Sequence, residues 1–143
     1  MKIHDVMRGK ASAEVITILP DASVRDLLAL LAQHNIGAVI VSTDGTIVEG
    51  IVSERDVVRK LNGDDAVLDA PVQQIMTAVV QTCAPGQDVD ELMTLMTEHR
   101  VRHVPVLDDG QLVAVISIGD VVKSRITQLE FERDQLDNYV HQT

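Results

Sequence analysis

The sequence predicts an α+β fold in which a β-α-β-β-α unit occurs twice and a helix closes the chain. When the chain is offset by 65 residues, residues 20–45 lie over residues 85–110, and 9 of these 26 aligned positions are identical. Beyond that segment the offset becomes 64, and the stretch "SERDVV" (53–58) lies over "SIGDVV" (117–122). Such self-similarity indicates two copies of one supersecondary unit.

Each copy opens with a short extended stretch that stops at a proline, since proline cannot continue a ladder inside a sheet. These stretches are residues 15–19 and 79–83. An amphipathic helix follows in each copy, because apolar residues recur there at helical spacing. They are Val24, Leu27, Leu28 and Leu31 in the first copy and Val89, Leu92, Met93 and Met96 in the second.

Two β-rich runs come next in each copy and are joined around an Asp-Gly pair, the strongest short signal for a β-hairpin. The runs are 38–41 and 47–52 around Asp44-Gly45 in the first copy, and 104–107 and 112–117 around Asp109-Gly110 in the second. A second helix then begins near Asp56 or Asp120. The predicted order of elements is therefore β-α-β-β-α, twice.

The two copies are expected to span residues 1–62 and 72–125, with the polar, turn-rich segment 63–71 as the linker. Residues 126–143 are predicted to form a C-terminal helix. Its residues at helical spacing are Ile126, Leu129, Arg133, Leu136 and Val140. A helix of this kind packs on its own domain or on a sister subunit. Because the two copies already complete a compact unit, we favour the sister subunit and expect a homodimer.

Charge and composition exclude several classes of partner. The chain has 12 Lys and Arg against 22 Asp and Glu, so its net charge is −10, and such a field repels nucleic acid and anionic lipid. The apolar runs are too short to cross a bilayer, and Asp5 stands where a secretory signal would be apolar. The single cysteine, Cys83, fits a reducing compartment. We therefore expect a cytoplasmic protein without nucleic-acid or membrane partners.

The doubled pattern resembles a tandem pair of cystathionine-β-synthase (CBS) domains, a Bateman module. The resemblance is carried by "HNIGAVIV", "EGIVSERDVV" and "HRVRHVPVLDDGQLVAVISIGDVV", together with the leading "VM" and "IM" near the start of each copy. It covers about residues 6–125, and the tail is similar to the end of small stand-alone bacterial members. The resemblance implies that the copies pack about a pseudo-two-fold axis with two clefts between them. It also implies that adenosine nucleotides such as AMP, ADP, ATP or NAD bind in these clefts.

The resemblance further implies which residues contact the nucleotide. One cleft would join Thr82, Arg102 and His103 of the second copy to Ser53, Arg55 and Asp56 of the first. The other would join Thr17, Gly37 and Ala38 of the first copy to Ser117 and Asp120 of the second. No catalytic residue and no metal ligand is expected in either cleft.

The two Ser-x-x-Asp motifs, Ser53 to Asp56 and Ser117 to Asp120, have two compatible interpretations. In a capping box the serine accepts a backbone N–H, and the acid three residues on reaches back to the serine. A carboxylate at a helix start can also accept hydrogen bonds from the 2′- and 3′-hydroxyls of a ribose, and the helix dipole favours its charge there. A 2′-phosphate would bring a second anion to that carboxylate, so NADP should be rejected.

The cations are divided unequally between the two predicted clefts. Arg102 lies where the first copy has Gly37, Arg55 lies over Gly119, and His103 follows Arg102. These three cations either form a solvated basic edge or bind phosphate oxygens, which a guanidinium fork and an imidazole both suit. The second interpretation predicts one cleft that prefers phosphate-bearing ligands. The other cleft would then hold a different nucleotide, a nucleoside-like group or nothing.

The sequence therefore predicts a non-catalytic sensor or regulatory module for adenosine nucleotides. Two alternatives stay open. One is a regulatory subunit that mainly binds another protein, with the nucleotide as its switch. The other is an enzyme that acts on a nucleotide in the cleft, but the sequence has no nucleophile–base pair, metal cluster or phosphate loop that would support it. Cys83 is interpreted as a buried small hydrophobe.

Overall fold

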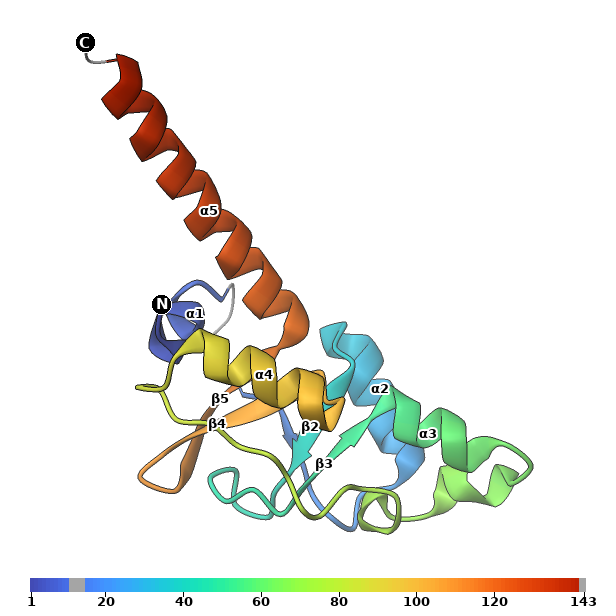
Figure 1. The fold of residues 1–143 in the computed structure, drawn as a ribbon. Coiled ribbons are helices and arrows are strands. Elements are labelled where there is room, and N and C mark those ends of the chain that lie inside the picture. Colours follow the sequence, from blue (N-terminus) through green and yellow to red (C-terminus); the bar gives the residue numbers. More distant parts are fainter. Residues whose placement is uncertain (11–14, 142–143) are drawn as a thin grey trace.

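The computed structural model describes residues 1–10 and 15–141 and confirms the α+β class (Figure 1). The helices are α1 (Ile3–Arg8), α2 (Val24–His34), α3 (Glu54–Leu61), α4 (Val89–His99) and α5 (Ile118–His141). The strands are β1 (Thr17–Ile18), β2 (Ala38–Val41), β3 (Gly50–Ser53), β4 (His103–Asp108) and β5 (Gln111–Ser117). Short 3-10 helices lie at Asp65–Asp69, in the segment between the copies, and at Val72–Gln74, at the start of the second copy.

The strands form two small sheets, one in each copy. β1 runs parallel to β2, and β2 pairs antiparallel with β3 so that Ala38 lies opposite Ser53. β4 pairs antiparallel with β5 so that His103 lies opposite Ser117. In both copies the register therefore places the first residue of one strand beside the serine that begins a Ser-x-x-Asp motif.

The first strand of the second copy is shorter than the sequence predicts. Within the described residues, the run 79–83 pairs with β4 only through Cys83, as a parallel bridge to Val106. Cys83 N donates to Pro105 O at 3.1 Å, and Leu107 N donates to Cys83 O at 2.8 Å. Val79, at the start of the run, is 83% exposed. The beginning of this predicted strand thus lies in solvent instead of extending the sheet.

The two Asp-Gly turns also differ. Asp109 and Gly110 both have positive φ (51° and 77°), the geometry of a two-residue type I′ hairpin. In the first copy, Asp44 Oδ1 accepts hydrogen bonds from the N–H groups of Thr46 and Ile47 at 2.9 and 3.0 Å. Because these amides bond to a side chain, they cannot pair across a ladder. β3 accordingly starts later than the sequence predicts.

The hydrophobic cores show that the two copies exchange their leading segments. Ile3 and Val6 of α1 are buried in the core of the second copy, among residues of α4, β4, β5 and α5. Val72 and Ile75, which lead into the second copy, are buried in the core of the first. Thr77 pairs with the edge strand β3 in the same exchange. Each leading segment therefore completes the core of the other copy, as a pseudo-two-fold arrangement requires.

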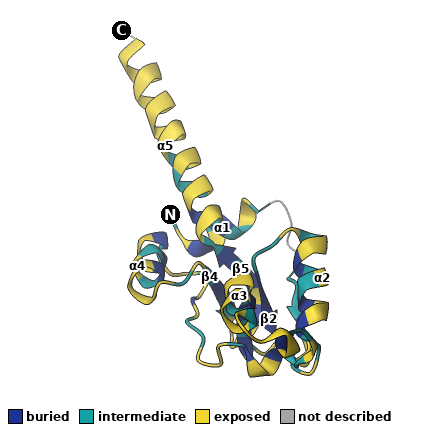
Figure 2. Cartoon of the chain, turned by 90° about the vertical axis from the view of Figure 1, so that its right-hand side faces the viewer, coloured by how far each residue is buried: buried dark blue, intermediate teal, exposed yellow. Residues whose placement is uncertain are grey.

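α5 is one continuous helix, where the sequence predicts a closing helix near Asp120 followed by a separate helix from residue 126. Its first turns pack on the body, since Val121 is buried and Arg125 Nη2 lies 3.2 Å from Asp90 Oδ1 of α4. The remainder projects away from the body (Figure 1) and is largely exposed (Figure 2). Over residues 1–10 and 15–141, no helix has the length and apolar character needed to span a bilayer.

Candidate functional site

Two cavities lie between the copies and share a wall. One, of about 630 Å³, opens beside the motif that starts at Ser53 and is here called the arginine cleft, because four arginines line it. The other, of about 360 Å³, opens beside the motif that starts at Ser117 and is called the lysine cleft, because Lys10 lines it. The shared wall consists of Gly37, Ala38, His103 and Ser117.

The structure brings together most of the residues that the sequence assigns to each cleft. The arginine cleft is lined by the predicted residues Ser53, Arg55, Asp56, Arg102 and His103. The lysine cleft is lined by the predicted residues Gly37, Ala38, Ser117 and Asp120. Each set comes from both copies, so the pairing of one copy's strand start with the other copy's Ser-x-x-Asp motif is present in the fold.

Thr17 and Thr82 are not among the residues that line either cavity. Thr17 pairs with Ile40 in the first sheet, whereas Thr82 is exposed next to the single-residue bridge of the second copy. Ile16, the residue before Thr17, lines the lysine cleft instead, and Thr77, five residues before Thr82, lines the arginine cleft. The shortened first strand of the second copy explains why Thr82 does not reach the position that a full strand would give it.

Both Ser-x-x-Asp motifs are capping boxes, as the sequence predicts. Ser53 N donates to Asp56 Oδ2 at 2.8 Å, and Asp56 N donates to Ser53 Oγ at 3.3 Å. Ser117 N donates to Asp120 Oδ2 at 2.9 Å, and Asp120 N donates to Ser117 Oγ at 3.1 Å. Among the described residues, the hydrogen bonds to both carboxylates use Oδ2 and leave Oδ1. Each carboxylate can therefore cap its helix and still accept a further donor.

Asp120 differs from Asp56 because a lysine already holds it. Lys10 Nζ donates to Asp120 Oδ2 at 2.6 Å and to Val115 O at 2.9 Å. Burial by itself raises the pKa of Asp120, but the hydrogen bonds from Lys10 and from the Ser117 N–H outweigh burial and hold the pKa below its usual value. The lysine cleft thus contains the ionised carboxylate of Asp120, and Lys10 of the same chain neutralises its charge.

Lys10 was not predicted, although the repeat contains a signal for it. Val15 follows Met7 by eight positions, whereas Val79 follows Met76 by three. The first copy therefore has extra chain between its leading segment and its first strand, and Lys10 lies in this extra chain. This difference in length between the copies is the sequence signal that Lys10 has no counterpart in the second copy.

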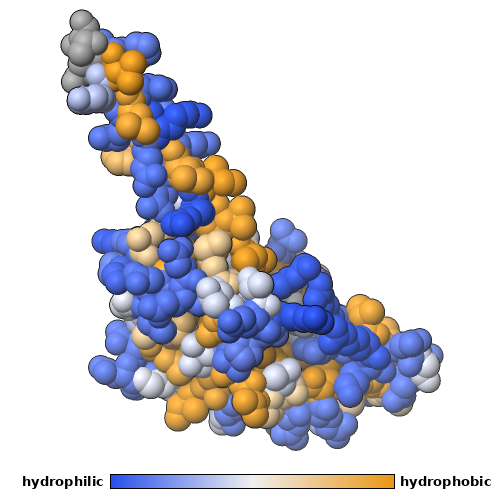
Figure 3. All heavy atoms as spheres, in the orientation of Figure 1, coloured by the Kyte–Doolittle hydropathy of each residue, from blue (hydrophilic) through white to orange (hydrophobic). Residues whose placement is uncertain are grey.

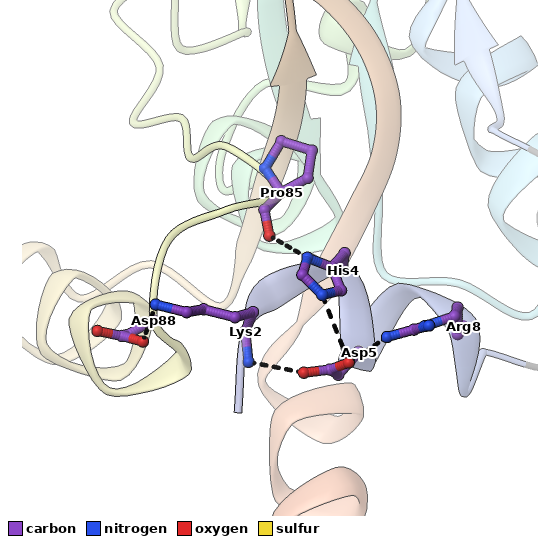
Figure 4. A network of polar contacts seen from close by, with 6 residues as sticks. All are labelled: Lys2, His4, Asp5, Arg8, Pro85 and Asp88. Carbon is purple, nitrogen blue, oxygen red and sulfur yellow. Dashed lines mark hydrogen bonds and ion pairs between the residues drawn. The ribbon is translucent and has the colours of Figure 1, made fainter.

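A polar network attaches α1 to the second copy (Figure 4). It thereby also fixes the start of the segment that carries Lys10. Lys2 Nζ lies 2.7 Å from Asp88 Oδ1, just before α4. His4 Nδ1 donates to Pro85 O at 3.1 Å. α1 is thus attached to the copy that also provides the carboxylate partner of Lys10.

The arginine cleft concentrates positive charge in an acidic chain. Among the described residues, four arginines and two carboxylates line it, so their formal charges sum to 4 − 2 = +2 with His neutral, against −10 for the whole chain. Arg59, Arg100 and His99 line it without having been predicted. Arg59 follows Arg55 by four residues on α3 and therefore shares its helix face, so helical spacing could have identified it.

His103 lies in the wall that the two clefts share. Burial lowers the pKa of His103 below its usual value, although the nearby charges of Asp120 and Glu54 act in the opposite direction. The imidazole is therefore neutral at pH 7 and acts as a hydrogen-bonding group. This corrects the expectation that His103 adds a third positive charge to the arginine cleft.

Cys83 is buried, as the sequence predicts, and burial raises the pKa of its thiol to about 11. Its Sγ donates to Pro105 O at 3.7 Å. A neutral thiol in this position is a poor nucleophile. In the part of the chain that the structure describes, no group of three or more His, Cys, Asp or Glu side chains is arranged to hold a metal ion.

The sequence profile of the CBS domain matches the chain twice, over residues 3–63 and 72–126. The chain belongs to the CBS domain family. It is similar to the CBS domain-containing protein CBSX3, mitochondrial, of Arabidopsis thaliana, with 34% identity over 147 residues that cover 96% of this chain and 71% of that protein. Its fold is similar to the crystal structure of the CBS-domain containing protein ATU1752 from Agrobacterium tumefaciens. That structure has 42% identity and a TM-score of 0.82, over 87% of this chain and 99% of the other.

Two further CBS domain structures of similar fold contain adenosine-based ligands. The CBS domain pair of protein MJ0100 was solved in complex with 5′-methylthioadenosine and S-adenosyl-L-methionine, at 22% identity and a TM-score of 0.76 over 86% of this chain and 98% of the other. CBSX2 was solved in complex with AMP, at 22% identity and a TM-score of 0.74 over 88% and 97%. At this identity the likeness concerns the fold, and it confirms the paired-CBS architecture that the repeat predicts.

Proposed function

We propose that this CBS domain protein is a non-catalytic regulatory module that binds adenosine nucleotides between its two copies. The observation that carries the proposal is the arginine cleft, in which a carboxylate at a helix start and four arginines line one cavity. The AMP complex of CBSX2 and the 5′-methylthioadenosine and S-adenosyl-L-methionine complex of MJ0100 support an adenosine-containing ligand.

In the proposed binding mode, Asp56 Oδ1 accepts hydrogen bonds from the 2′- and 3′-hydroxyls of the ribose while Oδ2 caps α3. Arg55 and Arg102 bind phosphate oxygens, because a guanidinium presents paired donors to them. Neutral His103 donates a further hydrogen bond. Val101 lines the same cavity and offers apolar surface to the adenine. ATP, ADP, AMP and NAD all carry the vicinal hydroxyls and phosphate that this site requires.

The lysine cleft is proposed as a second and weaker nucleotide site. Its volume is about 360 Å³, compared with about 630 Å³ for the arginine cleft. The ion pair with Lys10 already neutralises Asp120 there. A ligand in this cleft meets one lysine instead of four arginines, so we expect a nucleoside or a monophosphate to bind there in preference to a triphosphate.

We further propose that the protein is a homodimer in the cytoplasm. α5 exposes large apolar side chains, including Leu129 at 58% and Leu136 at 66%, which favours contact with a second copy. The buried free thiol of Cys83 fits a reducing compartment. Bound nucleotide would regulate by binding one relative setting of the copies or subunits more tightly than another, as an allosteric effector must.

A thermal-shift series tests the proposal, with AMP, ADP, ATP, NAD and NADP as ligands and GTP as the base-specificity control. A ligand at about a hundred times its dissociation constant should add roughly 2.7 kcal/mol to the free energy of unfolding. We expect a higher melting temperature with the adenosine nucleotides and NAD but not with NADP. The absence of any shift with the adenosine nucleotides would contradict nucleotide binding. Chemical conversion of the nucleotides on incubation would contradict the non-catalytic role.

A further inference from the structure

Six residues form a continuous seam along one side of α5. They follow one another at alternating spacings of four and three residues, the spacing of a coiled-coil seam. The seam consists of Val122, Ile126, Leu129, Arg133, Leu136 and Val140. Its five apolar side chains are between 48% and 66% exposed. Figure 3 shows hydrophobic side chains following one another up the projecting helix.

The seam and the face of α5 that packs on the body are two different sides of the helix. Val121 is buried, and Ser124 and Gln128, which follow it at helical spacing, line the groove between α5 and α1. Because successive helical residues are about 100° apart, the seam lies roughly a third of a turn away from this face. A second helix can therefore lie along the seam without displacing α1 or α4.

We propose that the seam binds the seam of a second copy, with the two α5 helices antiparallel and the two-fold axis level with Phe131. In this register Val122 lies opposite the partner's Val140, and Ile126 lies opposite the partner's Leu136. Every residue of the seam then meets a seam residue of the partner. The inference rests on the homodimer proposed above and adds to it the contact surface, the direction and the register.

The position of Arg133 selects the antiparallel direction. In a parallel pair in register, each Arg133 would face the partner's Arg133, and Glu132 would lie beside the partner's Asp137, so both contacts would join like charges. An opposite-charge contact in that geometry, Arg125 beside the partner's Glu130, would compete with the ion pair that Arg125 forms with Asp90. In the antiparallel pair, Arg133 lies opposite the partner's Leu129. Its guanidinium can then reach the partner's Glu130, which is one residue further along the helix.

A second charge pair supports the same register. Lys123 and Asp137 lie on one edge of the seam, and neither forms an ion pair with another side chain in the described residues. In the antiparallel pair, Lys123 lies within about 3 Å of the partner's Asp137 along the helix axis, and symmetry provides this contact twice. The antiparallel pair also places Glu130 beside the partner's Glu130 and Glu132 beside the partner's Glu132. The two Arg133 side chains lie next to these like-charge contacts and offset them.

Cross-linking through introduced cysteines tests the register. In the proposed dimer, two copies of residue 130 lie about 3 Å apart along the axis on the same edge, whereas two copies of residue 136 lie about 15 Å apart. With a short bis-maleimide, Glu130→Cys should therefore give a covalent dimer and Leu136→Cys should not. The wild-type chain, with buried Cys83 as its one thiol, is the matched control.

The outcomes separate this inference from the proposals on which it rests. Cross-linking through Leu136→Cys but not through Glu130→Cys would overturn the antiparallel register while leaving a dimer. A monomer in sedimentation velocity at the same concentration would overturn the homodimer itself. AMP binding, measured on the same samples, reports on the nucleotide proposal independently of both results.

Charge reversal tests the same register without a cross-linker. Lys123→Glu and Asp137→Lys should each raise the dimer dissociation constant by about threefold to tenfold at low salt, and the double variant should restore it. Lys60→Glu, an equivalent reversal on the exposed face of α3, should leave the dissociation constant unchanged. In a parallel pair residues 123 and 137 are about 21 Å apart along the axis, so a double variant that restores nothing would overturn the antiparallel pairing.

Discussion

Lys10 Nζ lies 2.6 Å from Asp120 Oδ2, although 110 residues separate the two in the chain. The side chain of Lys10 is 24% exposed and that of Asp120 is 26% exposed, so the pair is partly shielded from solvent. Among the described residues Asp56 has no such lysine partner, so this contact distinguishes the Ser-x-x-Asp motif of the lysine cleft from that of the arginine cleft. It also joins the extra segment of the first copy to the helix start of the second.

Replacing Lys10 tests the contribution of this pair to stability. Lys10→Met should lower the free energy of unfolding by about 1 kcal/mol at pH 7, because a partly buried carboxylate loses its charged partner. The pKa of Asp120 is depressed in the folded state, so the contribution is present above the unfolded value of 3.8 and is lost as the pH falls through the folded pKa. The difference between variant and wild type should therefore shrink on acidification below 3.8.

Urea denaturation at pH 7, and at decreasing pH as far as the fold persists, measures this difference. Lys60→Met is the control, because Lys60 is exposed on α3 and the same change there should alter stability by less than about 0.5 kcal/mol. A difference between Lys10→Met and wild type that stays constant across the titration of Asp120 would show that the lost stability is not electrostatic.

The ribose role of Asp56 can be separated from its capping role. Asp56→Asn keeps a side-chain oxygen for the Ser53 N–H but removes the charge, so the fold should persist. Affinity for AMP should fall by about 10- to 100-fold, because hydrogen bonds to a charged acceptor contribute about 1.5–3 kcal/mol. Isothermal titration calorimetry provides the measurement. Asp26→Asn is the control, since Asp26 occupies the same position in the Ser23-capped helix α2. Equal AMP affinities in the two variants would leave capping as the full explanation of the motif.

Phosphate recognition in the arginine cleft can be isolated by comparing AMP with adenosine. Arg102→Gln should weaken AMP binding about tenfold or more and leave adenosine binding nearly unchanged, because only AMP carries the phosphate. Arg25→Gln is the matched control, since Arg25 pairs with Asp69 on the surface, away from both clefts. A loss of similar size for adenosine and AMP would instead indicate that Arg102 shapes the cleft without binding phosphate.

The exchange of leading segments makes a prediction about Gly50. A Cβ at this position would clash with Met76 Sδ and would lie 3.0 Å from Thr77 O, so the edge of β3 has no room for a side chain. Gly50→Ala should therefore lower the free energy of unfolding by about 1–3 kcal/mol. Combining it with Met76→Ala should recover part of the loss, which would appear as a coupling energy in a double-mutant cycle. Gly86→Ala, where an added Cβ would meet nothing within 4 Å, is the control and should change stability little.

Much of the fold could be predicted because its signals are local. Asp109-Gly110 forms the predicted two-residue hairpin, because both residues adopt the positive φ that this turn requires. The capping bonds of Ser53 and Ser117 span three residues and form as the motif predicts. The predictions that depended on longer-range partners were less accurate. The run 79–83 has the composition of a strand, yet its pairing with β4 depends on where the neighbouring chain lies in space.

The sequence by itself determined that the chain consists of two related copies, where α2, α3, α4 and α5 begin, and which residues of one copy correspond to those of the other. These features depend on hydrophobic periodicity, turn conformation and capping, all of which act over a few residues. The tertiary structure decided that α1 completes the core of the second copy and that Lys10 neutralises Asp120. It also lowered the pKa of His103. Those outcomes depend on burial and on distances between atoms far apart in the chain, and only the packed arrangement of both copies defines them.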